Sequence, residues 1–219
     1  MKGKHYKRKS TRRQKRAVSS AKRARGGGTL KNAQTGERYS LGSPLGEQST
    51  NEIYVSKSNP NVLIKLIQKP KFGEAEMDAY SSGQIRNELR LAQHCHSLDL
   101  PVPKVYHTEF QEDEENFKGY IVMERIRGSI ISSVAAFEDK FDKIYDALNE
   151  LLSHGILQND LNINNFIVKG GKVYAIDFED VTDLNQMPLL ESANIKLDKR
   201  DVRDKLYGSL LTKIEFATF

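Results

Sequence analysis

The sequence predicts an α+β fold, and two patterns of apolar residues support this. From residue 39 onward, short stretches carry the runs and alternations typical of strands, whereas over 83–98 and 137–154 apolar residues recur at helical spacing. The expected order is strand, strand, helix, strand and strand, and then helix, a strand hairpin and a final helix. The sequence contains no internal repeat.

Charge is divided unevenly between the first residues and the rest. The 219 residues include 34 Lys and Arg and 29 Asp and Glu, which gives a formal net charge of +5. Residues 1–25 hold 12 of the basic residues and no acid, so residues 26–219 carry 22 basic and 29 acidic residues, a net charge of −7. We expect 1–38 to be a basic disordered tail, because it has almost no large apolar side chain to offset the entropy lost on ordering.

Length and composition exclude several classes of protein. A body of about 180 residues can bury one core or two small lobes, but not two large domains. No apolar run approaches the roughly 18–20 residues of a transmembrane helix, and no apolar stretch follows the positive N-terminus as in a secretory signal. The single cysteine, Cys95, cannot form an internal disulfide. We therefore expect an intracellular protein, in the nucleus or cytoplasm, or in a host cell if the source is a pathogen or virus.

The first part of the body predicts two strands, a helix and two more strands. Residues 41–54 and 62–67 have strand character and flank a turn-rich connection. The helix at 83–98 has an apolar face and stops before two prolines, which cannot continue it. The last two strands, 102–110 and 117–126, are joined by an acidic stretch that we expect to be an exposed hairpin loop.

The second part of the body begins with a helix at 137–154. Gly155 follows it and suits a left-handed helix cap. Residues 166–168 and 173–180 then predict two strands joined by a tight turn, and 198–214 predicts a final amphipathic helix.

Three oxygen-bearing side chains are expected at one end of the second hairpin. Asp160 and Asn165 lie just before its first strand, and Asp177 lies at the end of its second. Mg²⁺ prefers oxygen ligands and typically binds through one or two carboxylates together with substrate phosphates. The simpler interpretation is that Asp160 and Asn165 only form a loop and Asp177 only caps a turn. The order and spacing of the three residues favour the metal site.

These residues also carry a resemblance to a known family. The stretch Asp160-Leu161-Asn162-Ile163-Asn164-Asn165 matches the Asp-x-x-x-x-Asn of the kinase catalytic loop, and Asp177-Phe178-Glu179 sits where kinases have Asp-Phe-Gly. Over about residues 40–180 the sequence resembles the protein-kinase-like superfamily, in particular small bacterial effector kinases, lipopolysaccharide core sugar kinases and RIO-type kinases. The resemblance implies a bilobal fold, with an antiparallel-sheet N-lobe at 39–126 and a truncated, mainly helical C-lobe at 127–219.

The resemblance implies residues that bind ATP. Gly46 takes the place of the first glycine in the loop over the nucleotide, with Gln48 and Asn51 in place of the next two, and Ile53 would pack on adenine. Met123 sits at the gatekeeper position. The backbone from Glu124 to Ile126 would bind adenine, although the same stretch also reads as an ordinary buried strand.

Lys65 would hold the α- and β-phosphates, and Glu88 on the following helix would pair with it. A lysine that points from a strand into solvent is the alternative for Lys65. Glu74 and Glu76 are weaker candidates for the pairing role.

The implied mechanism is Mg²⁺-dependent phosphoryl transfer from ATP. Asp160 would orient the acceptor hydroxyl and accept its proton, while Asn165 and Asp177 would hold Mg²⁺. Gln158-Asn159 replaces the kinase His-Arg, so we predict that activity does not require loop phosphorylation. Glu179 replaces the glycine that lets the Asp-Phe-Gly segment flip, which predicts a fixed Asp177.

Three functions remain open from the sequence. The first is a minimal serine/threonine-type protein kinase, for which the complete set of implied residues argues. The second is a kinase acting on a sugar or other small molecule, for which the missing Ala-Pro-Glu and the short C-lobe argue. The third is a pseudokinase binding module, for which the degraded glycine loop argues.

The basic tail indicates an anionic partner. Its Lys and Arg density over residues 1–25 suits nuclear targeting, nucleic-acid phosphates or an anionic membrane surface, and with one aromatic, Tyr6, contacts would be electrostatic. A solubilising or self-phosphorylated tail is the alternative. We also expect a protein substrate, which the sequence does not identify.

Overall fold

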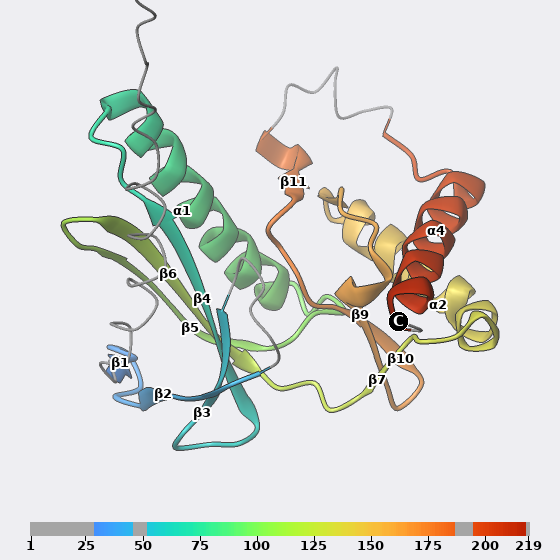
Figure 1. Ribbon diagram of the computed structural model, residues 1–219, viewed down its shortest axis with the longest axis horizontal. Helices are drawn as coiled ribbons and strands as arrows, with labels where there is room; N and C mark the ends of the chain where they lie inside the picture. Colours follow the sequence, from blue (N-terminus) through green and yellow to red (C-terminus); the bar gives the residue numbers. More distant parts are fainter. Residues whose placement is uncertain (1–28, 46–51, 187–194, 218–219) are drawn as a thin grey trace, which may run out of the picture.

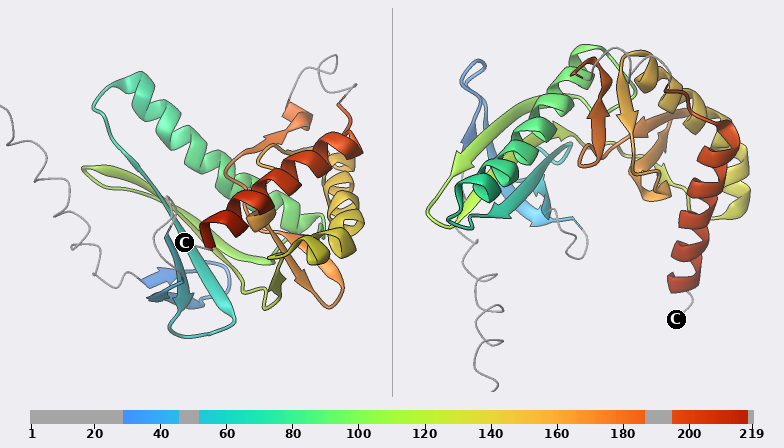
Figure 2. Two further views of the ribbon diagram at one scale, coloured as in Figure 1. Left: turned by 45° about the vertical axis from the view of Figure 1, so that its right-hand side comes forward. Right: turned by 90° about the horizontal axis from the view of Figure 1, so that it is seen from above.

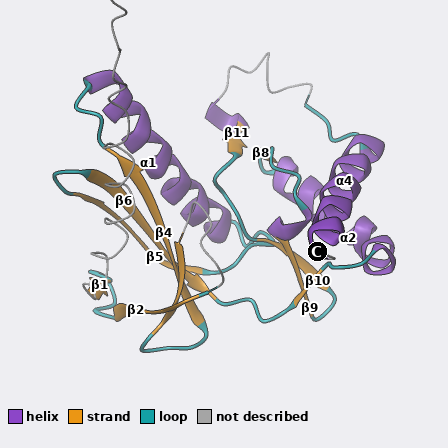
Figure 3. Ribbon diagram, viewed as in Figure 1, coloured by secondary structure: helices purple, strands orange, loops and turns teal. Residues whose placement is uncertain are grey.

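The computed structural model describes residues 29–45, 52–186 and 195–217, with most strands in the first part and helices α2 and α4 in the second (Figure 1 and Figure 3). The first part contains a six-stranded sheet of order β1-β2-β3-β4-β6-β5, in which every neighbouring pair is antiparallel. Its strands are β1 (Thr29–Lys31), β2 (Arg38–Pro44), β3 (Glu52–Ser56), β4 (Val62–Pro70), β5 (Val105–Glu112) and β6 (Asn116–Glu124).

Helix α1 (Ala75–Ser97) covers one face of this sheet and packs against β4, β5 and β6. Because side chains alternate along a strand, Ile67 of β4 faces α1, whereas Val62 and Ile64 face a small cluster with Leu30 and Tyr39. The β1–β2 hairpin therefore covers the second face of the sheet.

Gly119 of β6 sets how closely α1 approaches the sheet. A Cβ atom at this position would lie 2.5 Å from the Cγ2 atom of Ile85, which is too close for any side chain without a shift of Ile85 or of the helix. Glu88 is one helical turn beyond Ile85, so this contact also fixes the height of Glu88 above the sheet.

The second part combines helices with two small sheets. Strands β10, β9 and β7 form one sheet in that order, and β11 pairs with β8 in the other. The elements are β7 (Ser129–Ile130), α2 (Val134–Ser153), β8 (Ile156–Gln158), the 3-10 helix η2 (Ile163–Asn165), β9 (Phe166–Lys169), β10 (Lys172–Ala175), β11 (Val181–Asp183), the 3-10 helix η3 (Leu184–Gln186) and α4 (Lys199–Ala217).

Local sequence signals define the ends of α2. The Ser133 hydroxyl oxygen accepts a hydrogen bond from the Ala136 N–H group, as in a helix N-cap. After the helix, Gly155 has a φ of 78°, so the left-handed conformation predicted for it is confirmed.

A single large apolar core joins the two parts. It runs from α1 and β6 through α2 to α4, with Ile85, Ile121, Phe137, Leu148 and Leu206 among its buried members. Figure 2 shows the large sheet with α1 toward one end of the molecule and the pair α2 and α4 toward the other. Among the described residues, no helix combines the length and apolar character needed to cross a membrane.

The structure corrects the predicted extent of the tail. Residues 1–28 lie outside the described part of the chain, but Thr29–Lys31 form β1 and residues from Arg38 form β2. Leu30 and Asn32 are buried. The average composition of residues 1–38 gives no indication of β1, because a single buried leucine, Leu30, is enough to anchor this short edge strand.

Two predicted element boundaries are also wrong. Helix α1 begins at Ala75, eight residues before the predicted start. The prediction placed the start too late because most side chains in the first turns are exposed and form no apolar stripe. The strand predicted over 173–180 ends at Ala175. Beyond this point the backbone turns toward the preceding loop, where the Ile176 N–H group donates to the Asn165 carbonyl at 3.0 Å.

The β1 strand makes a testable contribution to stability. Leu30→Ala removes most of a buried side chain from the cluster with Tyr39, Val62 and Ile64, so we expect the free energy of unfolding to fall by about 2–3 kcal/mol. Lys31→Ala, an exposed neighbour in the same strand, is the control and should change it little. Urea denaturation of both variants measures this, and equal stability of Leu30→Ala and wild type would contradict a folded β1.

Candidate active site

Lys65 lies at the centre of the large sheet. Strand β4 is paired on both sides, with Lys65 opposite Ile53 of β3 and opposite Ile121 of β6. The alternation along β4 turns Lys65 to the same face as Ile67, toward α1. Only 3% of Lys65 is exposed, so the alternative of a solvent-facing strand lysine is wrong.

Two carboxylates hold the buried ammonium group. The Lys65 Nζ atom is 2.7 Å from Oε1 of Glu88 and 2.6 Å from Oδ1 of Asp177. Glu88 is on the buried face of α1, whereas Glu76 is exposed in the first turn and Glu74 precedes the helix. The ion pair that the sequence predicts between Lys65 and Glu88 is therefore present, and Asp177 joins it.

Burial and charge act against each other in this cluster. Burial alone would lower the pKa of Lys65, but the negative charges of Glu88 and Asp177 outweigh it, so that the pKa is raised and the group is an ammonium ion. Burial raises the pKa of Glu88, and the attraction of Lys65 opposes this increase. A single cation thus compensates two carboxylates that come from different parts of the chain.

The loop between β8 and β9 brings Asp160 and Asn165 together. The Asn165 amide nitrogen donates to Oδ2 of Asp160 at 2.8 Å and to the Asp160 carbonyl at 3.3 Å. Asn165 is in η2, whose backbone is supported from α4, because the Ile163 N–H group donates to the Ser209 hydroxyl oxygen at 2.9 Å. With its nitrogen engaged, the Asn165 amide has its oxygen left as the atom that suits a cation.

Asp160, Asn165 and Asp177 line one cavity of about 380 Å³. The other residues around it are Gln84, Gln158, Glu179 and Asp180, so every residue that lines it is polar and four of them carry carboxyl groups. The predicted convergence of the three oxygen-bearing side chains is thus what the structure shows, although their chemical roles stay predictions.

The donor set fits Mg²⁺ together with a nucleotide. Within the described residues, no group of three or more His, Cys, Asp and Glu side chains is arranged to hold a metal ion. Mg²⁺ usually takes only one or two protein carboxylates and completes its shell with phosphate oxygens and water. Asp177, whose side chain is about one-third exposed, and the Asn165 amide oxygen match that smaller set.

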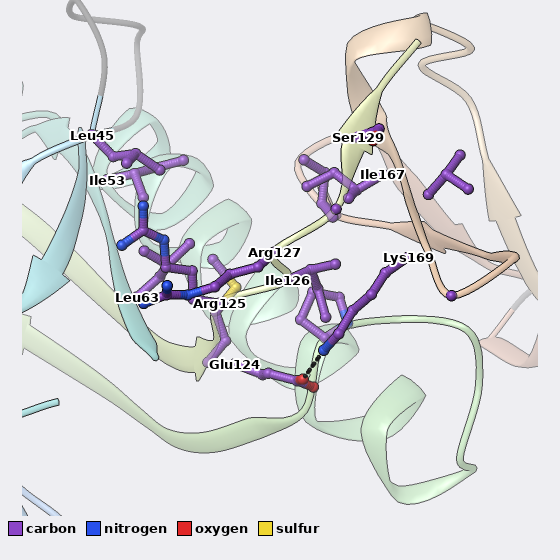
Figure 4. Close-up of a pocket in the computed structure, with 16 residues that line it drawn as sticks. Leu45, Ile53, Leu63, Glu124, Arg125, Ile126, Arg127, Ser129, Ile167 and Lys169 are labelled. Atoms are coloured by element: carbon purple, nitrogen blue, oxygen red, sulfur yellow. Dashed lines mark hydrogen bonds and ion pairs between the residues drawn. The ribbon is translucent and has the colours of Figure 1, made fainter. Parts of the chain in front are cut away.

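A second cavity, of about 730 Å³, lies between the large sheet and the β9–β10 hairpin (Figure 4). Of the residues predicted to bind ATP, Ile53, Met123, Glu124 and Ile126 line it, and Gly46 lies outside the described residues. The cavity is also lined by residues that the sequence did not predict, among them Leu45, Leu63, Ile167, Lys169 and Ile176. Leu63 lies on the same face of β4 as Lys65, a period-two signal that could have identified it.

The backbone from Glu124 to Ile126 is already partly engaged. The Glu124 N–H group donates to the Lys104 carbonyl, and the Arg125 N–H group donates to the Asn61 carbonyl, both at 2.8 Å. Among the described residues, the Ile126 N–H group has no such hydrogen bond. Of the three predicted residues, Ile126 is therefore the one with a backbone donor suited to an adenine ring.

Ion pairs connect the two parts of the chain around these cavities. Lys169 of β9 reaches Glu124 at 3.1 Å across the larger cavity (Figure 4). Arg90 of α1 reaches Asp183 of β11 at 2.8 Å. Burial alone would raise the pKa of Asp183, but the hydrogen bonds from Arg90 and from the Asn185 backbone lower it below its usual value.

Removal of the buried ammonium group should produce a pH-dependent loss of stability. Lys65→Met leaves Glu88 buried without its cation, so we expect a loss of about 3 kcal/mol near neutral pH. The pKa of Glu88 is raised in the folded state and rises further in this variant, so the folded state binds a proton more readily than the unfolded chain. The difference in the free energy of unfolding between wild type and Lys65→Met should therefore be larger at pH 8 than at pH 5. Urea denaturation at both pH values measures this difference.

The control for this experiment is Lys57→Met, since Lys57 is exposed. The double variant Lys65→Met/Glu88→Gln should lose most of the added pH dependence, because no buried carboxyl group from α1 remains. A deficit that is the same at both pH values would show that the Lys65 ammonium does not compensate Glu88.

Comparisons with known proteins match parts of this chain. A family model described as "Phosphotransferase enzyme family" matches residues 72–154, which include α1, β5, β6 and α2. A "Probable bifunctional tRNA threonylcarbamoyladenosine biosynthesis protein" of Methanothermobacter thermautotrophicus (strain Delta H) is 29% identical over 97 residues, and the match covers 44% of this chain and 17% of that protein.

The fold and the comparisons converge. The antiparallel sheet with its covering helix, followed by a smaller and more helical part, is a kinase-like α+β arrangement. The matched family of phosphotransferases is part of the protein-kinase-like superfamily. The resemblance of this chain to the protein-kinase-like superfamily, predicted from its sequence, is confirmed.

Proposed function

We propose that this chain is an ATP- and Mg²⁺-dependent phosphotransferase that acts on serine or threonine hydroxyl groups of a protein. The observation that supports this most directly is the Lys65–Glu88–Asp177 cluster, which lies behind the polar cavity that holds Asp160 and Asn165. The match to the phosphotransferase family model supports the coarser assignment as a kinase-like phosphotransferase.

In this proposal the larger cavity takes the adenine ring. Ile53, Met123 and Ile126 provide apolar contacts, and the Ile126 N–H group donates to a ring nitrogen. Lys65 holds the α- and β-phosphates with its ammonium group, and Glu88 keeps that group in place. Gly46 would contribute to the loop over the phosphates.

The polar cavity takes the reacting groups. The oxygen of the acceptor hydroxyl forms a bond to the γ-phosphorus, and Asp160 accepts the proton that this hydroxyl loses. The bond from the γ-phosphorus to the bridging oxygen breaks, and ADP leaves. The Asn165 amide orients Asp160 through the hydrogen bond of 2.8 Å. Asn165 and Asp177 would hold Mg²⁺, which supplies positive charge that offsets the charge of the phosphates.

Two substitutions test the proposed reaction. Asp160→Asn should lower ATP turnover by about 100-fold or more, since it removes the proton acceptor, and Asp177→Ala should abolish the dependence on Mg²⁺ together with most turnover. Asp204→Asn, an exposed acid of α4, is the matched control. Turnover of [γ-³²P]ATP with a protein extract is the measurement, and unchanged rates in both active-site variants would refute the proposed function.

The same experiment separates the proposal from its alternatives. Phosphate found only on sugars or other small molecules would identify the second candidate, a small-molecule kinase, for which the short C-lobe argues. Absence of both ATP binding and turnover would favour a pseudokinase binding module.

We also propose that residues 1–25 contact an anionic partner such as nucleic acid, on the basis of their 12 basic residues. Binding of single-stranded RNA to the full chain should weaken by about 10-fold or more between 50 and 200 mM salt, because binding releases counterions. A chain without residues 1–25 should bind weakly at both salt concentrations. Tail-dependent affinity that is the same at 50 and 200 mM salt would contradict an electrostatic contact.

A further inference from the structure

Gln158 is a buried polar residue between the two loops of the candidate active site. It is the last residue of β8, lies opposite Val181 of β11, and is only 5% exposed. A buried amide is stable only when its donor and acceptor atoms are hydrogen-bonded, so its partners show what it holds in place.

Both ends of the Gln158 amide contact backbone atoms of candidate catalytic residues. The Nε2 atom donates to the Asp177 carbonyl at 2.7 Å, and the Oε1 atom accepts from the Asp160 N–H group at 3.2 Å. One rigid, planar group therefore spans the distance from the residue proposed as the proton acceptor to the residue proposed as a metal ligand.

The neighbouring contacts join the same loops farther from the reacting groups. Asn159 donates through its backbone to the Asp180 carbonyl at 3.0 Å and through its side chain to Thr182 at 3.0 Å. These bonds attach the chain after Asp177 to the loop before Asp160. Gln158 differs from them because its two bonds end on Asp160 and Asp177 themselves.

We propose that Gln158 is a positioning residue that sets the separation of Asp160 and Asp177. This inference rests on the proposed function, since the separation matters for transfer between a bound nucleotide and an acceptor hydroxyl. Misplacement of a reacting group by about 1 Å costs up to about 100-fold in rate, so a single rigid bridge can have a large kinetic effect.

The test compares side chains of similar size with different hydrogen-bonding groups. Gln158→Met removes both bonds and should lower kcat by about 10- to 100-fold, with little change in the KM for ATP, because the adenine cavity does not include this residue. Gln158→His retains one donor and one acceptor when neutral and should recover much of the lost kcat. Gln93→Met, on the exposed face of α1, is the control and should have wild-type kinetics.

Binding of ATP gives a readout that does not depend on turnover. Without Mg²⁺, Gln158→Met should bind ATP as wild type does. With Mg²⁺, the gain in affinity should be smaller than in wild type, because Asp177 is no longer held in place. Isothermal titration calorimetry at both conditions measures this difference.

Several outcomes would overturn the inference. A kcat per folded molecule equal to wild type in Gln158→Met, a loss that Gln158→His does not recover, or an unchanged gain in affinity from Mg²⁺ would each show a purely structural role. If Gln158→Met does not fold, Gln158→Glu replaces it, since this change keeps the acceptor for the Asp160 N–H group and removes the donor to Asp177. Wild type without any turnover would refute the proposed function instead, and the calorimetric comparison alone would then decide the role of Gln158.

Discussion

The buried ammonium group of Lys65 is the constraint on which the rest of the site depends. An unpaired charge in the protein interior costs several kcal/mol, so Lys65 at its 3% exposure requires its two carboxylate partners. One partner is on α1 and the other follows β10, which means that sheet, helix and loop must reach their places together. The close contact between Gly119 and Ile85 supports this arrangement by fixing the helix against the sheet. The large apolar core that runs from α1 to α4 then holds the two parts of the chain around the cavities.

Much of this arrangement could be predicted from the sequence because its signals are local. The apolar run of β4 and the helical spacing along α1 are visible in a few residues each, and the spacing of Asp160, Asn165 and Asp177 is that of a known motif. Strand pairing then brings these residues together. The start of α1 could not be predicted from periodicity, since most side chains of its first turns are exposed and their apolar residues follow no stripe.

Other features depend on contacts that leave no local pattern. Among the described residues, the Gln158 side chain bonds only to backbone atoms of Asp160 and Asp177, so no partner side chain marks it in the sequence. Arg90 and Asp183 are 93 positions apart and lie in elements with no shared motif. Strand β1 cannot be predicted for a different reason, because three residues with a single buried leucine give too short a pattern to stand out in a polar stretch. Such contacts form only in the tertiary structure. For this reason the sequence predicts whether a segment is a helix or a strand better than it predicts the residues at which that segment begins and ends.

The ion pair between Arg90 and Asp183 has a consequence for how such an enzyme would be controlled. It connects β11, which follows Asp177 in the chain, to α1, the helix that carries Glu88. The pairing of β11 with β8 also holds this segment in place. The negative partner of Arg90 is the carboxylate of Asp183, which is part of the chain. Unlike the phosphate of a phosphorylated residue, it cannot be removed by a phosphatase. Under the proposed function, folding alone would produce the active arrangement of side chains. Control would then act on how much of the protein is made, or on which molecules reach its cavities.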